Sequence, residues 1–173
     1  MSLIVQKYGG TSVANPDSLK IVAEKIISAK KEGKQVVVVV SAMGSSTDEL
    51  IALANELSET PSPREMDMLL SAGERITMSL LAMHLNSLGY DSYSLTGSQA
   101  GIITTSRHGR AEIEKISGER VKEGLEKGSI VIVAGFQGFN PDTREITTLG
   151  RGGSDATAVA LAASLGAEKC EIY

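Results

Sequence analysis

The sequence predicts an α/β fold, a three-layer α/β/α sandwich in which helices cover both faces of a mainly parallel central sheet. Three short apolar runs rich in β-branched residues indicate the sheet: LIVQK (3–7), VVVVVS (36–41) and IVIVAG (130–135). They lack apolar–polar alternation, which is typical of strands that are covered on both faces, as in parallel sheets. Helical patterns lie between them, as the crossover connections of parallel strands require.

The first crossover is the clearest of these helical patterns. In NPDSLKIVAEKIISAKKEG, Asn15 can cap a helix, Pro16 suits its first position and Gly33 can end it. One apolar face is formed by Leu19, Val22, Ala23 and Ile26. Together with its flanking strands, this helix predicts a βαβ unit with a right-handed connection.

The remaining elements continue the alternation of strands and helices. Residues 47–58 predict a second helix capped by Thr47 or Ser46, and residues 62–89 predict a long helical stretch with Gly73 in its middle. The rest, in chain order, is expected to be a strand at 90–95, irregular strands or a hairpin at 96–117, a helix at 118–128, a hairpin at 139–148 turned by Asn140-Pro141-Asp142, a helix within 149–164 and a last strand within 167–173.

Composition excludes several classes of protein. The chain of 173 residues is long enough for one substantial core, and 42% apolar residues with a mean hydropathy of +0.02 describe a soluble globular protein. No run approaches a membrane span, and MSLIVQKYGG lacks the features of a signal peptide, which favours the cytoplasm and no membrane partner. A net charge of −4 with 3% aromatic residues argues against nucleic acid. The single cysteine, Cys170, cannot form an internal disulfide and is expected to be buried in the last strand.

Three predicted strands end on glycine or small polar residues, at 7–12, 41–46 and 135–138. In open α/β sheets, ligands bind beyond the carboxyl ends of the strands, so we expect these loops to open onto one edge. Glycines let backbone N–H groups approach anionic oxygens, and a helix amino terminus adds partial positive charge. With the helix start at 150–155, the three loops predict a phosphate or other anion site.

Standard nucleotide and hydrolase motifs are absent from the sequence. There is no Walker A loop, no Gly-x-Ser-x-Gly elbow and no His-Glu-x-x-His pair. In GRGGSD, Asp155 stands where a dinucleotide fingerprint needs its third glycine. These absences disfavour a P-loop NTPase, a common NAD-binding domain and a serine hydrolase.

Lys7 and Asp155 are the first candidate pair. Lys7 ends a strand that otherwise looks buried, so it is either a cation over a transferring phosphate or a lysine that snorkels from the strand end. Asp155, in the first turn of a helix, is explained by capping alone unless Lys7 lies beside it.

Arg151 and Glu74 are candidates for binding an organic substrate. Glycines flank Arg151, whose guanidinium either pairs with a carboxylate in bidentate fashion or is solvated in its loop. Glu74 lies in an apolar helical stretch, where it is a surface residue, a partner of Arg75 or a partner of a substrate amine.

Six motifs occur together and in order: VQKYGGTSV, VVVVVSAMGSSTDEL, REMDMLLSAGERIT, TGSQAGI, VAGFQGF and TTLGRGGSDATAVALAASLGAEKCEIY. They closely resemble the catalytic region of bacterial aspartokinases, within the amino acid kinase family, almost from end to end. The resemblance implies ATP-dependent phosphorylation of the side-chain carboxylate of L-aspartate to 4-phospho-L-aspartate. That reaction is the first step towards lysine, threonine, methionine and diaminopimelate.

The resemblance also implies cofactors and partners. ATP is expected with Mg²⁺ that is held mainly through the nucleotide phosphates, and no metal ligand is assigned to the chain itself. A homo-oligomer or hetero-oligomer is expected for the full-length protein. Two alternatives stay open, a kinase for another acidic amino acid such as glutamate or acetylglutamate, and a non-catalytic module that binds aspartate.

Site residues follow from the same resemblance. Lys7 and Asp155 are expected to be catalytic, with Asp155 orienting the lysine. The expected aspartate-binding residues are Ser41, Thr47, Glu74, Arg151, Gly152, Gly153 and Ser154. The expected nucleotide-binding residues are Lys7, Tyr8, Gly9, Gly10, Gly44 and Tyr173. Within this set Glu74 faces the substrate amino group and Arg151 takes the α-carboxylate. The acceptor is already a carboxylate, so no general base is needed.

The sequence departs from the family pattern in two respects. Ala156 stands where many relatives have threonine. In the family, the strand after CEIY continues into elements that hold the adenine and ribose, and regulatory modules that sense lysine or threonine usually follow. The resemblance therefore implies that residues 1–173 are a partial catalytic domain, its substrate-binding part, with the rest of the nucleotide-binding part and the regulatory modules outside it.

Overall fold

A five-stranded sheet forms the centre of the computed structural model, which describes residues 2–173. The strand order is β3-β6-β2-β1-β9, and all four pairings are parallel. The strands are β1 (Leu3–Tyr8), β2 (Gln35–Val40), β3 (Ser92–Leu95), β6 (Ile130–Ala134) and β9 (Lys169–Ile172). The apolar runs of the sequence thus form neighbouring strands, as predicted.

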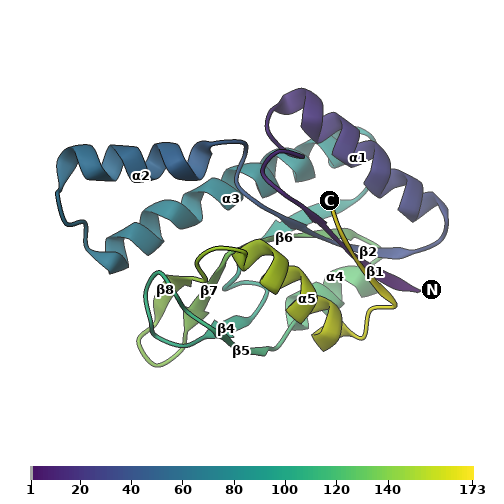
Figure 1. Ribbon diagram of the computed structural model, residues 1–173. Coiled ribbons are helices and arrows are strands. Elements are labelled where there is room, and N and C mark those ends of the chain that lie inside the picture. The colour runs from purple at the N-terminus through teal and green to yellow at the C-terminus, as the bar shows by residue number, and fades with distance from the viewer. Residues whose placement is uncertain (1) are drawn as a thin grey trace.

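Helices cover both faces of this sheet (Figure 1). The helices α1 (Pro16–Lys31) and α3 (Pro63–Ser87) pack on one face, and α4 (Glu119–Glu126) and α5 (Gly153–Leu165) pack on the other. Each face has its own buried apolar cluster. The predicted three-layer sandwich is confirmed.

The strand β2 shows why the apolar runs do not alternate. Val36, Val38 and Val40 point into the cluster below α1 and α3, whereas Val37 and Val39 point into the cluster below α4 and α5. All five valines are fully buried. Successive side chains point to opposite faces of a strand, so a strand covered on both faces needs apolar residues at every position.

A second, four-stranded sheet was not expected from the sequence. Its order is β5-β4-β7-β8, with β4 (Ile102–Thr104), β5 (Ile113–Ile116), β7 (Gln137–Asn140) and β8 (Glu145–Thr148). The predicted hairpin at 139–148 is present as the antiparallel pair of β7 and β8, and the segment 96–117, expected as irregular strands or a hairpin, contains the antiparallel pair of β4 and β5. The parallel pairing of Ile103 with Phe139 joins the hairpins. Local sequence patterns carry no information on such a long-range pairing.

The amino-terminal caps of α1 and α2 were both predicted from the sequence. Asn15 Oδ1 accepts a hydrogen bond from the Ser18 N–H at 2.9 Å, so the predicted cap of α1 is confirmed. The predicted cap of α2 (Ser46–Leu57) by Thr47 or Ser46 is wrong, because Ser45 is at the N-cap position and makes no side-chain cap bond. Ser46 Oγ instead donates to the Met43 carbonyl at 2.6 Å and stabilises the preceding turn.

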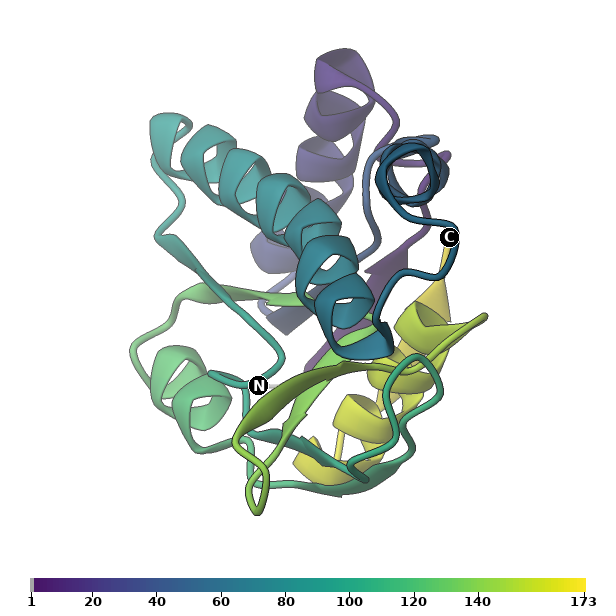
Figure 2. The ribbon, with the colours of Figure 1, turned by 90° about the vertical axis from the view of Figure 1, so that its left-hand side faces the viewer.

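The helix α2 lies against α3 and away from the central sheet, and Figure 2 shows it nearly end-on. None of its residues is buried.

Gly73 lies in the middle of the continuous helix α3, where a Cβ atom would come within 2.7 Å of Ala42 Cβ. The glycine allows α3 to approach the loop that follows β2.

Cys170 is only partly buried, so the expectation of a buried cysteine is wrong; it lies on β9, which is an edge strand of the described sheet. Among residues 2–173, no helix combines the length and apolar character needed to cross a bilayer.

Replacement of Leu81 by alanine should destabilise the protein strongly. Leu81 is fully buried between α3 and the sheet, and truncation of a buried leucine costs about 2–5 kcal/mol through lost burial and the cavity left behind. Leu80→Ala is the matched control, because the neighbouring Leu80 is 40% exposed. Urea unfolding followed by circular dichroism measures both. Equal losses of unfolding free energy in the two variants would contradict the assigned packing of α3.

Candidate active site

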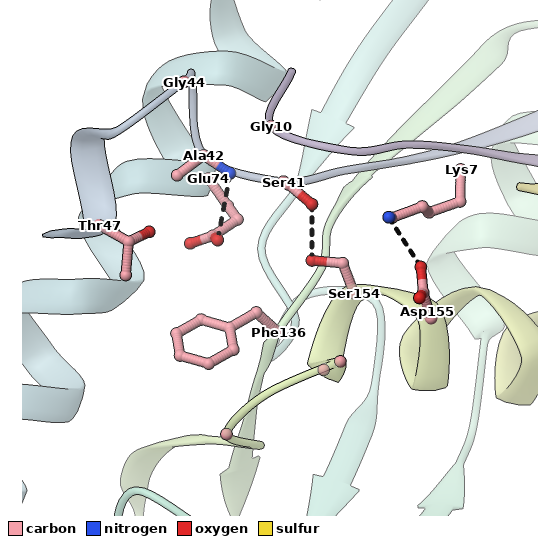
Figure 3. Close-up of a pocket in the computed structure, with 13 residues that line it drawn as sticks. Lys7, Gly10, Ser41, Ala42, Gly44, Thr47, Glu74, Phe136, Ser154 and Asp155 are labelled. Atoms are coloured by element: carbon pink, nitrogen blue, oxygen red, sulfur yellow. Dashed lines mark hydrogen bonds and ion pairs between the residues drawn. The ribbon is translucent and has the colours of Figure 1, made fainter. Parts of the chain in front are cut away.

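A pocket of about 290 Å³ opens at the carboxyl edge of the parallel sheet (Figure 3). The three predicted strand-end loops and the start of α5 all contribute to it, which confirms that they share one edge. Its lining residues are Lys7, Gly10, Ser41, Ala42, Gly44, Thr47, Glu74, Phe136, Gly150, Gly152, Gly153, Ser154 and Asp155. Most of the residues singled out in the sequence therefore lie together, and four of them, Tyr8, Gly9, Arg151 and Tyr173, do not line the pocket.

Lys7 and Asp155 form an ion pair in the wall of the pocket. Lys7 Nζ lies 2.7 Å from Asp155 Oδ1, and the side chains are 12% and 49% exposed, respectively. Lys7 is the penultimate residue of β1, and Asp155 lies in the first turn of α5, which packs on β1. The lysine thus has a partner at the pocket and does not extend into bulk water.

Ser41 and Ser154 lie beside this ion pair. The Ser41 Oγ donates to the Ser154 Oγ at 3.0 Å and joins the end of β2 to the start of α5 (Figure 3). The N-cap of α5 is Gly152, which supplies no side-chain cap. The first N–H groups of a helix lack partners within the helix, so this uncapped amino end is suited to anionic oxygens.

Glu74 occupies the opposite side of the pocket. Its side chain is almost fully buried on α3; Oε1 accepts a hydrogen bond from the Ala42 N–H at 3.2 Å, whereas Oε2 is buried without a partner. Burial raises the pKa of Glu74 to about 7, although backbone hydrogen bonds at Glu74 and Ala42 partly oppose the rise. Buried polar atoms are nearly always partnered, so Oε2 is arranged to accept a hydrogen bond from a ligand.

This geometry decides between the earlier readings of Glu74. It is not a surface residue, because Glu74 is only 3% exposed. Among the described residues, no lysine or arginine lies within ion-pair distance of it, so the expected alternative of a pair with Arg75 is wrong. The close approach at Gly73 brings the adjacent Glu74 to the Ala42 backbone.

Phe136 is a lining residue that sequence reasoning missed. Its φ of 70° is in the left-handed region, which is unusual for a bulky side chain. The Phe136 N–H donates to Thr157 Oγ1 at 3.1 Å, and the Phe136 carbonyl accepts from the Leu149 N–H at 2.9 Å. These bonds hold the ring in the pocket wall shown in Figure 3. The only signal in the sequence was an aromatic residue among glycines after a strand.

Arg151 lies beside the pocket and not in it. Gly150 and Gly152 on either side of it have φ values of 80° and 73°, a turn that favours glycine. The exposed Arg151 lines a neighbouring apolar groove of about 720 Å³ that shares Thr47, Phe136 and Gly150 with the pocket.

Tyr8, Gly9 and Tyr173 form a separate group where β1 meets β9. The Tyr8 and Tyr173 rings stack with their centroids 5.0 Å apart, and the Gly9 N–H donates to the Tyr173 carbonyl at 3.0 Å. Burial raises the pKa of the Tyr8 hydroxyl above its usual range. The Gly9 N–H is thus already engaged in this structure, and the nucleotide role of these residues stays a prediction.

Comparison with known proteins identifies the family. Residues 2–173 match the model of the amino acid kinase family. The chain belongs to the amino acid kinase family. Aspartokinase 2 from Bacillus subtilis is 60% identical to this amino acid kinase over 173 residues, and an aspartokinase from Mycobacterium tuberculosis is 58% identical. The alignments cover the whole chain but only 42% and 41% of these relatives, so the chain spans about two fifths of their length.

Solved structures of aspartate kinases share the fold. The structure from Synechocystis superposes with a TM-score of 0.84 at 48% sequence identity, covering 99% of this chain and 28% of that one. Aspartokinase III from E. coli in complex with aspartate and ADP superposes with a TM-score of 0.87 at 26% identity, covering 99% and 48%. These superpositions confirm the predicted fold class, an α/β fold with a mainly parallel central sheet.

Stability should depend on pH through Glu74. Its pKa is about 7 in the folded state against 4.5 ordinarily, so between these values the folded protein keeps a proton that the unfolded chain has released. The free energy of unfolding should therefore fall by about 3 kcal/mol as the pH rises from 4.5 to above 7.

Glu74→Gln should remove this slope, and Glu24→Gln, which removes an exposed carboxylate on α1, should leave it in place. Urea unfolding at a series of pH values measures the difference. A wild-type slope that persists in Glu74→Gln would show that another group is responsible.

Proposed function

We propose that this amino acid kinase is the substrate-binding part of an aspartokinase catalytic domain, and that it takes part in transfer of the γ-phosphoryl group of ATP to the side-chain carboxylate of L-aspartate. The observation that carries the proposal is the pocket itself, with an ion-paired lysine on one side and, on the other, a buried carboxylate that has one unpartnered oxygen. Aspartokinases with 58–60% identity support the choice of substrate. So does E. coli aspartokinase III, whose structure contains aspartate and ADP.

The two sides of the pocket suit the two ends of an amino acid. Glu74 Oε2 would accept a hydrogen bond from the substrate ammonium, which removes the cost of leaving a buried oxygen unpaired. Arg151 would bind the α-carboxylate through its planar guanidinium after its exposed side chain turns into the pocket from the adjacent groove. Ser41, Thr47 and Ser154 supply hydroxyl groups between these ends. The side-chain carboxylate then lies towards Lys7.

In the transfer step, a carboxylate oxygen of aspartate attacks the γ-phosphorus, and the bond between that phosphorus and the bridging oxygen of ADP breaks. The acceptor is ionised at neutral pH, so no base has to remove a proton. Lys7 neutralises charge on the phosphoryl oxygens, and Asp155 holds the lysine in position. Catalysis thus depends on alignment and charge.

The nucleotide phosphates fit the same edge of the pocket. The uncapped start of α5 and the glycines at positions 10, 44, 152 and 153 let backbone groups approach them. Within residues 2–173, no cluster of three metal-ligating side chains is present. We propose from the family resemblance that Mg²⁺ is held mainly through the nucleotide phosphates, where it would neutralise part of their charge.

The wider role is proposed from the family. The product would be 4-phospho-L-aspartate, which would feed lysine, threonine and methionine biosynthesis in the cytoplasm. An oligomeric full-length enzyme stays a prediction.

Aspartate binding should release a proton at low pH. With a pKa of about 7, Glu74 is mostly protonated at pH 6, and pairing with an ammonium group favours its ionised form. Calorimetry in buffers of different ionisation enthalpy should show release of about 0.9 proton per aspartate at pH 6 and almost none at pH 8.5. Glu74→Gln should bind aspartate at least about tenfold more weakly, with no release at either pH.

Binding without proton release would refute the assignment of Glu74 to the amino group. Stronger binding of glutamate or acetylglutamate than of aspartate would favour a kinase for another acid.

In the full-length enzyme, Lys7→Ala should lower phosphoryl transfer by about 10²–10³-fold, because a preorganised charge on the transferring group is lost, while aspartate affinity changes little. The acyl phosphate product is trapped with hydroxylamine and measured as the hydroxamate. Lys20→Ala is the control, since Lys20 is exposed and pairs only with Asp17. Aspartate binding by the full-length wild-type enzyme without any hydroxamate would favour the non-catalytic binding module.

A further inference from the structure

Asp67 is a buried carboxylate on α3 that the proposed reaction does not use. It is 1% exposed and lies outside the pocket. Its Oδ1 accepts hydrogen bonds from Thr148 Oγ1 at 2.5 Å and from the Gly109 N–H at 3.0 Å, and its Oδ2 lies 2.7 Å from His108 Nδ1. Burying a carboxylate costs free energy unless hydrogen bonds compensate for the lost water, and Asp67 has three such partners.

The partners of Asp67 belong to two segments that meet beneath the loop at residues 149–152, which carries Arg151 and is called the Arg151 loop below. Thr148 is the last residue of β8, three residues before Arg151. The Ala111 N–H donates to the Thr148 carbonyl at 2.9 Å, which joins the 105–111 loop to β8. Gly150 is also close to this loop, because a Cβ atom on it would lie 3.2 Å from the Gly109 carbonyl oxygen. Asp67, Gly109, Thr148, Gly150 and Arg151 all line the same apolar groove.

Asp67 and Glu74 are seven residues apart on one helix, so they lie on the same side of α3, two turns from each other. Glu74 bonds to the loop after β2 through the Ala42 N–H, and Asp67 bonds to the end of β8 through Thr148. The helix therefore fixes both the pocket carboxylate and the base of the Arg151 loop.

We propose that Asp67 is a positioning residue, which holds the Arg151 loop at the distance from Glu74 that an amino acid needs to contact both. Asp67 itself touches no substrate. Its hydrogen bonds set the place of Thr148 and of the turn from Gly150 to Gly153, and hence the spacing between the sites for the ammonium and α-carboxylate groups. This inference rests on the proposed binding of L-aspartate.

Two variants test it by different routes. Asp67→Asn keeps the shape of the side chain but replaces an acceptor oxygen by a donor group. Thr148→Val removes the hydroxyl from the other side of the bond and leaves Asp67 intact, so it serves if Asp67→Asn fails to fold. Thr148→Ser keeps the hydroxyl, and Glu65→Gln changes an exposed carboxylate on the same helix, so both are controls.

Two measurements are made on each variant, hydrogen exchange of residues 105–111 and 148–153, and calorimetric affinity for L-aspartate. Asp67→Asn and Thr148→Val should exchange about tenfold faster in these segments and bind aspartate about tenfold more weakly, with core exchange in β2 unchanged. The two controls should match the wild type.

The decisive comparison adds Arg151→Ala. If Asp67 acts through the Arg151 loop, Asp67→Asn should change aspartate affinity less than about twofold in the Arg151→Ala background, because coupled residues are not additive. An equal loss in both backgrounds, or unchanged exchange in the two segments, would overturn the inference. Absence of aspartate binding by the wild type would overturn the proposed function instead, and the exchange result would still decide whether Asp67 orders the loop.

Discussion

The burial of β2 on both faces is the constraint on which the other elements depend. Its five valines leave no face for water, so the strand requires a helical layer on each side and a strand on each edge. Parallel neighbours joined by crossovers satisfy both needs at once, and they bring the carboxyl ends of the strands to one edge. The loops after β1, β2 and β6 therefore meet there, and the pocket is a consequence of how the core is buried.

The polar groups of the pocket depart from the rules that hold in the core. Glu74 has an unpartnered oxygen that is buried away from water. Because burial makes its charged form costly, its pKa is raised to about 7. Phe136 adopts a left-handed backbone conformation that residues other than glycine seldom adopt. Local violations of this kind are typical of functional sites, where a ligand supplies the missing partner. They lie next to the ion pair of Lys7 and Asp155, so the pocket presents both a charge that is held in place and a carboxylate oxygen that lacks a partner.

The helix α3 connects these features mechanically. At Gly73 it approaches Ala42 closely enough for Glu74 to bond to the strand-end loop, and two turns earlier Asp67 bonds to β8 and to the loop at Gly109. A glycine in a helix interior lowers helix stability by about 1 kcal/mol relative to alanine, and a buried carboxylate is costly as well. Both are tolerated where they set distances across the site.

The sequence by itself determined the parallel sheet, most helices and the residues that gather at its edge, because strand burial, helix capping and glycine-ended strands are local patterns. From such patterns Lys7, Ser41 and Asp155 could be assigned to one edge before any contact was known, whereas Glu74 joined them only through the family resemblance. Only the tertiary structure decided how these groups interact. The ion pair of Lys7 with Asp155, the free oxygen of Glu74, the second sheet and the bonds of Asp67 to Thr148 all join residues that are far apart in the chain. Their charges and hydrogen bonds depend on distances of a few ångströms, which only the packing of α3 and α5 against the sheet can set.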